Sequence, residues 1–507
     1  MTPPEPAPTQ PRQAPPFHLR VQNAGLGAMD PRTTVLLWAS VSILLGLAVS
    51  ILLVRGEIRL LVLMLLGVLS LCCLSPRRGV FILTTFLPFM YLLRRLVLTM
   101  QEFDKRDPIL LFPVITAGLM LFSVLLFYGP VLLRYFRNSA LMKTCLFLVA
   151  IFTLQVFNPL QGGLLVGVAG GMYFIIPILW IAFGVLLKRE DIGRLFKLVM
   201  TIGTITALYG LYQHFYGLFA FEVYELKAKQ FYKFIGDKSN VRVMSTFASL
   251  GDFSLYLALA GIVCFASFWR SMRYFSLVLF LINIYTMLWM SVRTSFLLLM
   301  FSVVILMILH ARNTKAIVLR GAMAFVAIVI VYGLLYSHDP AKMYDQQFSA
   351  NPYIVHTLSG ITHPTKEVSF QLRLKSWANI VWTTVSEYPF GRGLGSTTPA
   401  AVKFEGGAFF EADSYFFEMF YGSGIVAPFL FLIVMYLTLR NLLRLVVQYP
   451  GDFTYKVVMA LLCGVFLGSI FGLALRDMIA GPIAWLLIGW TIRQEVDHRM
   501  GTNPREA

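Results

Sequence analysis

The sequence predicts an all-α polytopic membrane protein with about fourteen transmembrane helices and a large, partly helical external loop. The 507 residues are 58% hydrophobic and only 13% charged, whereas soluble proteins carry about a quarter charged residues. Apolar runs of roughly 20 residues, the length that crosses a bilayer core, recur along almost the whole chain. In lipid every backbone N–H and C=O must be paired within the protein, so these runs must be helices.

The chain divides into five predicted segments. Residues 1–31 are rich in Pro, Gln and Ala and are expected to form a disordered cytoplasmic tail, with no signal peptide. A transmembrane bundle (32–337), a large periplasmic loop (338–414), C-terminal transmembrane helices (415–492) and a cytoplasmic tail (493–507) follow. The predicted spans lie near 33–54, 57–75, 79–93, 109–133, 139–157, 168–187, 195–217, 251–268, 274–292, 294–309, 321–337, 415–439, 455–475 and 478–492.

The connections between spans predict the orientation. With both termini in the cytoplasm, roughly 23 Lys and Arg lie on cytoplasmic segments and roughly 13 on short external ones, as the positive-inside rule favours. The external segments 94–108 and 218–250 are themselves basic. They serve either as interfacial anchors or as an electropositive outer surface that attracts phosphate.

Residues 274–309 must fold back on themselves. As a single helix these 36 residues would be ~54 Å long, far more than the ~30 Å core of a bilayer. Arg293 is the only charged residue in this window. We therefore expect two helices with Arg293 at or near their outer turn.

The net charge of +17 does not indicate nucleic-acid binding, because the basic residues are scattered in short clusters between apolar runs. The five cysteines all lie in apolar runs and are expected to be packing residues. The seven histidines show no metal-ligand spacing. No metal site, nucleic-acid partner or cofactor is therefore predicted.

Four polar residues converge on the external face in this topology: Arg242, Arg293, Arg373 and Asp413. An arginine inside or at the edge of a membrane costs about 2.5–3.5 kcal/mol at the helix centre, so its presence suggests a partner. Guanidinium groups bind phosphate through two parallel hydrogen bonds and stay charged. The alternatives are that Arg293 is a snorkelling anchor and that Arg242 and Arg373 are ordinary surface residues.

From about residue 240 to 430 the ordered motifs resemble the O-antigen ligase and polysaccharide polymerase family, the WaaL and Wzy type. The chain has Arg293-Thr294-Ser295 near a helix–helix turn, then Arg373 and Trp377 in a large loop. A proline and spaced glycines follow, and a polar residue then opens a helix that ends in two further glycines. These motifs comprise Pro389, Gly391, Gly393, Gly395, Asp413, Ser414, Gly422 and Gly424.

The resemblance implies a bacterial inner-membrane enzyme that transfers glycan with inversion from an undecaprenyl-diphosphate donor. It implies that Arg293 and Arg373 clamp the diphosphate and stabilise the leaving group. Many members, ligases especially, carry a histidine where this chain has Asp413. Asp413 is therefore the candidate base for an acceptor hydroxyl, with Glu405, Glu411, His356 and His363 as rivals.

The loop itself contains further candidate binding residues. Leu374, Trp377, Val381 and Val385 recur at helical spacing, which predicts an amphipathic helix on the membrane surface with Arg373 and Trp377 on one face. The glycine run after Pro389 predicts a tight turn that brings Gly393 and Gly395 close to a sugar or phosphate. Arg242, Arg392 and Ser414 complete the candidate substrate contacts.

Arg476 and Asp477 are adjacent in an outer turn and are expected to form an internal ion pair.

The most concrete prediction is an exopolysaccharide or O-antigen polymerase. The expected partners are the lipid-linked glycan donor, an acceptor glycan, membrane lipid and other polysaccharide-assembly proteins. A ligase that passes glycan to lipid A core or to protein is the alternative within the same chemistry. A flippase for lipid-linked glycan is the alternative of another class, but no internal repeat of the kind found in transporters is evident.

Overall fold

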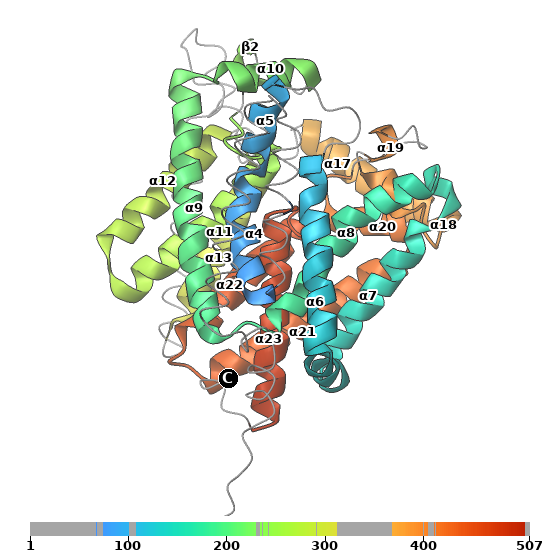
Figure 1. Ribbon diagram of the computed structural model, residues 1–507, viewed down its shortest axis with the longest axis vertical. Helices are drawn as coiled ribbons and strands as arrows, with labels where there is room; N and C mark the ends of the chain where they lie inside the picture. The colour runs from blue at the N-terminus through green and yellow to red at the C-terminus, as the bar shows by residue number, and fades with distance from the viewer. Residues whose placement is uncertain are drawn as a thin grey trace, which may run out of the picture.

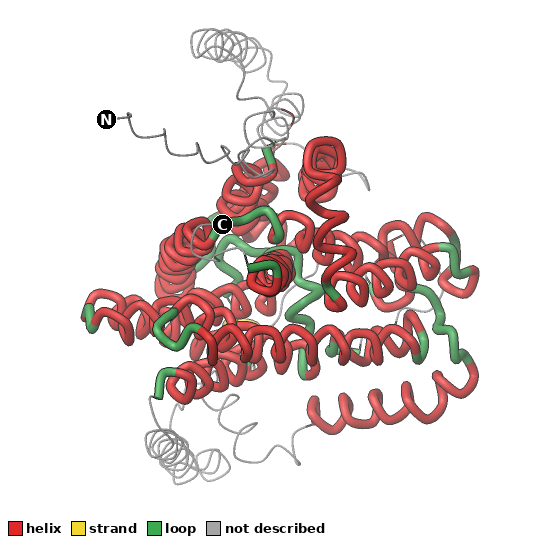
Figure 2. Tube along the Cα trace, turned by 90° about the horizontal axis from the view of Figure 1, so that it is seen from below, coloured by secondary structure: helices red, strands yellow, loops and turns green. Residues whose placement is uncertain are grey.

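The computed structural model describes residues 67, 75–100, 108–229, 234–235, 237–241, 243–290, 292–311, 368–398, 400–403, 410 and 412–501. Most of these residues are helical, and Figure 2 shows the helices packed side by side with short loops at their ends. A small antiparallel hairpin, formed by β1 (Phe234–Ile235) and β2 (Asp237–Val241), was not predicted. The helical class is otherwise confirmed.

Within the described residues, seven helices are long and apolar enough to cross a membrane: Pro76–Val97, Phe112–Asn138, Leu164–Gly184, Arg189–Tyr216, Leu250–Ser271, Val426–Gln448 and Phe453–Ile470. Three shorter apolar helices are Ala140–Val156, Tyr274–Met290 and Arg293–Leu309. The chain is thus a multi-pass membrane protein. The total of about fourteen spans stays a prediction, because 33–54, 321–337 and most of 57–75 lie outside the described residues.

The first half contains α4 (Pro76–Phe86), η1 (Leu87–Phe89), α5 (Met90–Met100), α6 (Pro108–Asn138), α7 (Ala140–Val156), η2 (Pro159–Gln161), α8 (Leu164–Gly184), α9 (Arg189–Tyr216), α10 (Ala220–Lys229), α11 (Leu250–Ser271), α12 (Tyr274–Met290) and α13 (Arg293–Leu309). The second half contains α17 (Val368–Asn379), η4 (Ile380–Thr384), α18 (Val385–Glu387), η5 (Leu394–Thr397), α19 (Ala400–Lys403), α20 (Tyr415–Ser423), α21 (Val426–Gln448), α22 (Phe453–Ile470) and α23 (Ala480–Arg499).

Several helix starts follow directly from local sequence. Ser139 and Ser249 accept hydrogen bonds from backbone N–H groups three residues later, at the starts of α7 and α11. Asp452 does the same for the N–H of Thr454 at the start of α22. Such side chains satisfy N–H groups that the first helical turn leaves unpaired. These caps explain why the helices begin close to the predicted boundaries.

The helices differ in how deeply they lie within the bundle. In α11, 83% of the most apolar 18-residue window is buried, against 28% in the window of α6. Nearly every residue of α23 is buried as well, and this helix packs extensively against α8. Thus α11 and α23 are central. The exposed side chains of α6, such as Phe122, Leu125 and Leu126, lie on the outside of the bundle, where an apolar surface suits lipid.

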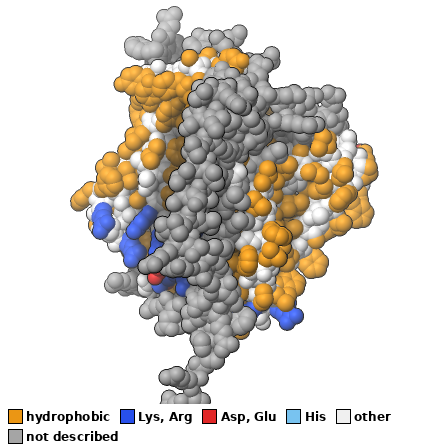
Figure 3. All heavy atoms as spheres, in the orientation of Figure 1, with side chains coloured by type: hydrophobic (Ala, Val, Ile, Leu, Met, Phe, Trp, Pro, Cys, Tyr) orange, Lys and Arg blue, Asp and Glu red, His pale blue; other side chains and the backbone are white. Residues whose placement is uncertain are grey.

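The two ends of the molecule carry different elements. Figure 1 shows α10, β2, α17 and α19 in the upper part of the molecule and α23 running to the bottom. Elements from both predicted external segments, 218–250 and 338–414, therefore lie in the upper part of the molecule, although α18 (Val385–Glu387) lies near mid-height. Figure 3 shows apolar side chains over the flanks, with Lys and Arg mainly toward the lower part of this face.

The turn at Arg293 is confirmed, because α12 ends at Met290 and α13 begins at Arg293.

The predicted continuous span 415–439 is wrong, whereas the motif of a helix that ends at Gly422 and Gly424 agrees with the end of α20 at Ser423. The chain breaks between α20 and α21 at Gly424, whose φ is +68°. A Cβ at this position would lie 2.0 Å from the carbonyl oxygen of Pro389. The break therefore allows the loop that contains Pro389 to contact the backbone directly, and the N–H of Ile425 donates to the same oxygen at 3.1 Å.

Candidate functional site

An ion pair between Arg373 and Asp413 lies at the centre of the candidate site. Nε of the Arg373 guanidinium donates to Oδ2 of Asp413 at 3.2 Å, joining α17 to the start of α20 across 40 residues of sequence. About a third of the Arg373 side chain and just under half of the Asp413 side chain are exposed. The structure thus brings together two of the predicted catalytic residues and leaves both within reach of an external ligand.

Trp377 holds α17 against this corner. Its indole N–H donates to the carbonyl of Ala412 at 2.8 Å, and its ring stacks on Phe417 with centroids 4.7 Å apart. Arg373 and Trp377 are one helical turn apart, so the same face of α17 carries the guanidinium and the ring that anchors it. This confirms that the two residues share a face.

The predicted amphipathic face is only partly correct. Leu374 is 46% exposed, whereas Trp377, Ile380 and Thr384 are buried. The stretch Ile380–Thr384 is π-helical, so one turn of this helix contains an extra residue. The buried positions after Ile380 are therefore shifted relative to those of a regular α-helix. The buried face therefore consists of Trp377, Ile380 and Thr384, and Leu374 lies outside it.

The start of α20 is fixed to the end of α22. The hydroxyl of Ser414 donates to the carbonyl of Ile470 at 2.6 Å and also accepts from the N–H of Phe417, capping α20. The N–H of Tyr415 donates to the carbonyl of Gly472 at 2.8 Å. These bonds place Asp413, whose φ is +52°, directly beside the turn after α22.

Arg293 is brought toward the same turn. It is the first residue of α13, and the next residue, Thr294, lies near Gly472, with Oγ1 3.7 Å from where a Cβ on Gly472 would be. Ser295 Oγ lies 2.7 Å from Ser254 Oγ in the first turns of α11. The turn after α22 thus contacts both the start of α13 and the start of α20, so Arg293 and Asp413 flank a common backbone segment.

A second ion pair, not anticipated from the sequence, lies below the first. Arg476 pairs with Glu418 of α20 and donates to the carbonyl of Thr397 at 3.0 Å. Its guanidinium also lies 5.7 Å from the ring centroid of Tyr173. Glu418 is fully buried. One signal was present in the sequence: Glu418 is a carboxylate in an otherwise apolar helix, where an ionised group needs a partner.

Asp477, the expected partner of Arg476, instead caps α23. Its Oδ1 accepts hydrogen bonds from the N–H groups of Ile479 and Ala480, and its carboxyl is also hydrogen-bonded to Asp252. Burial, together with the nearby Asp252 carboxyl, raises the pKa of Asp477 well above its ordinary value. Two carboxyls so close share a proton more readily than they carry two charges.

The glycine run forms a tight turn, as predicted, and packs into the bundle. Gly391 and Gly393 have φ of +82° and +91°. The N–H of Gly393 donates to the carbonyl of Gly422, and the N–H of Gly395 donates to Oε1 of Gln161. These amides are therefore engaged within the protein, and contact between the glycines and a substrate stays a prediction.

Arg392 extends from this turn between two aromatic rings. Its guanidinium carbon lies 4.8 Å from the ring centroid of Tyr388 and 5.6 Å from that of Tyr421. Stacking of this kind fixes the plane of a guanidinium. The remaining candidates, Arg242, Glu405, Glu411, His356 and His363, lie outside the described residues.

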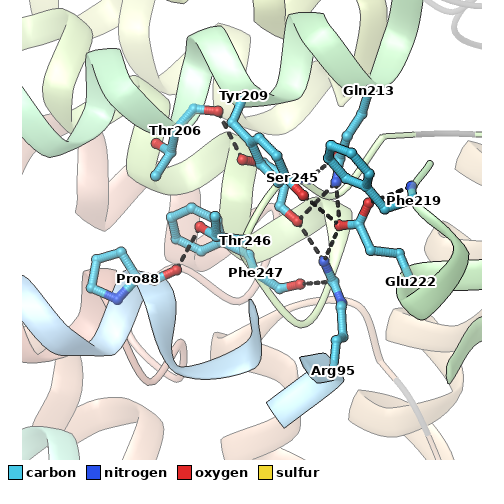
Figure 4. Close-up of polar contacts among 10 residues, drawn as sticks. All are labelled: Pro88, Arg95, Thr206, Tyr209, Gln213, Phe219, Glu222, Ser245, Thr246 and Phe247. Carbon is cyan, nitrogen blue, oxygen red and sulfur yellow. Dashed lines mark hydrogen bonds and ion pairs between the residues drawn. The ribbon is translucent and has the colours of Figure 1, made fainter. Parts of the chain in front are cut away.

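A buried polar cluster supports the external segment next to Arg242 (Figure 4). Arg95 of α5 pairs with Glu222 of α10 at 3.3 Å and donates to the carbonyls of Ser245 and Phe247. Burial raises the pKa of Glu222, although the N–H of Phe219 and the Arg95 guanidinium oppose this shift. The cluster ties α5, α9 and α10 to residues 245–247, just before α11.

Comparison with known families bears directly on these residues. Residues 275–432 match the family model Wzy_C, described as O-antigen ligase. The matched range begins within α12 and ends within α21, so it includes Arg293, Arg373, Trp377 and Asp413. The chain has no match among curated proteins. The match confirms the resemblance seen in the motifs and supports a membrane O-antigen ligase or polymerase type of function acting on lipid-linked glycans, with no support for a flippase. Residues 275–432 are therefore similar to the O-antigen ligase family, and this similarity covers about a third of the chain.

Proposed function

We propose that this protein is an inverting, metal-independent glycosyltransferase that polymerises oligosaccharides linked to undecaprenyl diphosphate. It would act at the periplasmic face of a bacterial inner membrane, with both termini in the cytoplasm. The observation that carries the proposal is the partly exposed ion pair between Arg373 of α17 and Asp413 at the start of α20. A cation suited to phosphate and a carboxylate suited to a hydroxyl proton lie side by side.

In the proposed reaction, a hydroxyl of the acceptor glycan attacks the anomeric carbon of the donor sugar. The bond between that carbon and the diphosphate oxygen breaks, and undecaprenyl diphosphate leaves with the bonding electron pair. The hydroxyl proton passes to the Asp413 carboxylate. Arg373 and Arg293 bind the diphosphate, and their fixed positive charges stabilise the negative charge that develops on it.

The second ion pair supports this arrangement from within. Glu418 lies on the helix that Asp413 precedes, and its bond to Arg476 ties that helix to the turn after α22. We assign Glu418 and Arg476 a positioning role: they hold α20 so that Asp413 stays beside the start of α13.

A ligase that transfers the finished glycan to lipid A core or to protein uses the same donor. The aspartate at position 413, where many ligases carry histidine, favours the polymerase. The two activities differ only in the acceptor, so a single assay separates them.

The test uses the purified full-length protein in liposomes with an undecaprenyl-diphosphate-linked repeat unit. The expected product is a ladder of elongated lipid-linked glycans, resolved on a gel or by mass spectrometry. Transfer to added lipid A core, without a ladder, would identify a ligase. If neither product forms although the protein remains folded, the proposal is wrong.

Substitution of Arg373 and Arg293, the two arginines proposed to bind the diphosphate, gives the first specific prediction. Arg373→Ala and Arg293→Ala should each lower the rate of elongation roughly 100-fold or more, as loss of a fixed charge at a transition state does. Arg373→Lys should also fail, because an ammonium lacks the planar fork of a guanidinium.

Lys375→Ala is the matched control, because Lys375 is an exposed cation on the same helix. It should leave elongation near the wild-type rate. Near-normal activity of Arg373→Ala, or equal losses in Arg373→Ala and Lys375→Ala, would rule out a specific clamp.

A further inference from the structure

A pocket lies at the opposite end of the molecule from the candidate active site. Its volume is about 410 Å³, and it lies between the final turns of α21 and α23. Asn441, Arg444, Leu445 and Gln448 line it from α21, and Glu495, His498 and Arg499 line it from α23. The bundle end that contains the C terminus therefore carries a polar cavity with two arginines.

Glu495 offers this pocket a buried carboxylate oxygen that can accept a hydrogen bond. The residue is only 6% exposed, and its Oε1 accepts an ion-pair bond from Arg499. Among the described residues its Oε2 is buried without a hydrogen-bond partner. A buried acceptor left unsatisfied typically costs about 1–3 kcal/mol. A ligand that offers an N–H group to Oε2 would remove that cost.

The surroundings of Glu495 are positively charged. Arg499, Arg444 and Arg440 all act electrostatically on its carboxyl, opposing the effect of burial. His498 is held at the rim, with Nδ1 2.9 Å from the hydroxyl of Tyr449. The pocket thus presents arginines suited to a phosphate and one carboxylate oxygen suited to an ammonium group.

The outer surface of α21 indicates that the ligand also has an apolar part. Exposed apolar side chains recur along this helix at intervals of three, four or seven residues, on the face next to the one that lines the pocket. The stripe consists of Phe429, Ile433, Tyr436, Leu443 and Val447. An apolar stripe on a candidate membrane span, next to a pocket lined by arginines at the end of that span, suits acyl chains attached to a polar headgroup.

We propose that this pocket binds the headgroup of an aminophospholipid, a glycerophospholipid whose headgroup carries a phosphate and a primary ammonium. The phosphate contacts Arg444 and Arg499, the ammonium donates to Oε2 of Glu495, and the acyl chains lie along the stripe of α21. The site is independent of the glycan chemistry at the other end.

The experiment measures lipid binding to the full-length protein in detergent by native mass spectrometry and by the shift in thermal midpoint. The probes are phosphatidylethanolamine, phosphatidylglycerol and water-soluble phosphoethanolamine. Phosphatidylethanolamine should bind roughly tenfold more tightly than phosphatidylglycerol, the change expected for one charge-assisted hydrogen bond. Soluble phosphoethanolamine should bind far more weakly, because it has no acyl chains.

The variants identify the groups responsible. Glu495→Gln should abolish the preference for phosphatidylethanolamine, whereas Arg444→Ala should weaken both lipids. Glu190→Gln, at an exposed carboxylate of α9, is the control and should keep the preference. Equal binding of the two lipids by the wild type, or a preference that survives in Glu495→Gln, would overturn the proposal. Full stabilisation by soluble phosphoethanolamine would also overturn it, in favour of a soluble ligand.

Discussion

Asp413 combines an unusual backbone with a functional side chain. Its φ of +52° lies in the left-handed region, which costs most residues energy but suits aspartate, asparagine and glycine. Its carboxylate meets Arg373, and its neighbours are bonded to the turn after α22. Backbone conformation therefore favours a small set of residues here, which includes histidine, and of these aspartate and histidine can accept a proton from a hydroxyl.

Asp413→Asn separates these two requirements. Asparagine tolerates the same φ, so the thermal midpoint should change little. Elongation should fall roughly 100-fold or more, as loss of a general base does, while donor binding persists. Initial elongation rates and binding of labelled donor provide the measurements. Unchanged elongation would assign the base to another group, and loss of donor binding would indicate that Asp413 acts only by orienting Arg373.

At the scale of elements, the glycine turn shows what sequence could and could not predict. The run after Pro389 indicated a turn, and a turn is present. Its contact surface could not be predicted, because Gly395 packs against α8, more than 200 residues away in the chain. The motif indicated a helix end at Gly422 and Gly424, but the reason for the break could not be predicted, because it accommodates Pro389 through a tertiary contact.

Gly395→Ala tests this packing. An added Cβ would lie 2.5 Å from the carbonyl oxygen of Val166, so the turn must move away from α8. We expect a loss of roughly 1–3 kcal/mol in stability, the usual cost of overpacking. Gly193→Ala is the control, since nothing lies within 4 Å of its added Cβ. Equal thermal midpoints for the two variants would show that the turn is not closely packed in solution.

The pair between Arg95 and Glu222 gives a second prediction at this scale. Both side chains are at most 4% exposed, so removing one leaves the other as a buried charge. Arg95→Ala and Glu222→Ala should each lower stability by about 3–5 kcal/mol. Glu190→Ala, at an exposed carboxylate, should have almost no effect in the same thermal assay. Comparable midpoints for Glu222→Ala and Glu190→Ala would contradict this view of the cluster.

For the whole molecule, composition predicted the helical membrane class, and bilayer thickness predicted the turn at Arg293. The order of motifs placed Arg373 and Asp413 in one candidate site, but it did not predict the ion pair between them. The sequence indicated that Glu418 needs a partner, but it could not identify Arg476, because the two residues are 58 positions apart and only the packing of α20 on the turn after α22 brings them together. Periodicity describes one helix at a time, whereas such pairs depend on how helices pack.

Orientation in the membrane is a prediction at the scale of the whole molecule. A cysteine at Ser386, exposed near α17, should react with a membrane-impermeant maleimide in intact spheroplasts. A cysteine at Asn138 should react only after lysis, because α6 ends beside α23 near the C terminus, where Arg134 pairs with Asp497. The extent of maleimide labelling of each variant is measured by mass spectrometry. Labelling of the Asn138 variant alone in intact spheroplasts would show that the orientation is opposite to the predicted one.

The nine residues of α20 have a mechanical consequence. Asp413, just before its start, pairs with Arg373 from earlier in the chain, and Glu418 within it pairs with Arg476 from later in the chain. A twist of this short helix would therefore displace both cations together. A ligand that moves Arg373 would therefore also move Arg476 inside the bundle, because both arginines are bound to carboxylates of the same short segment.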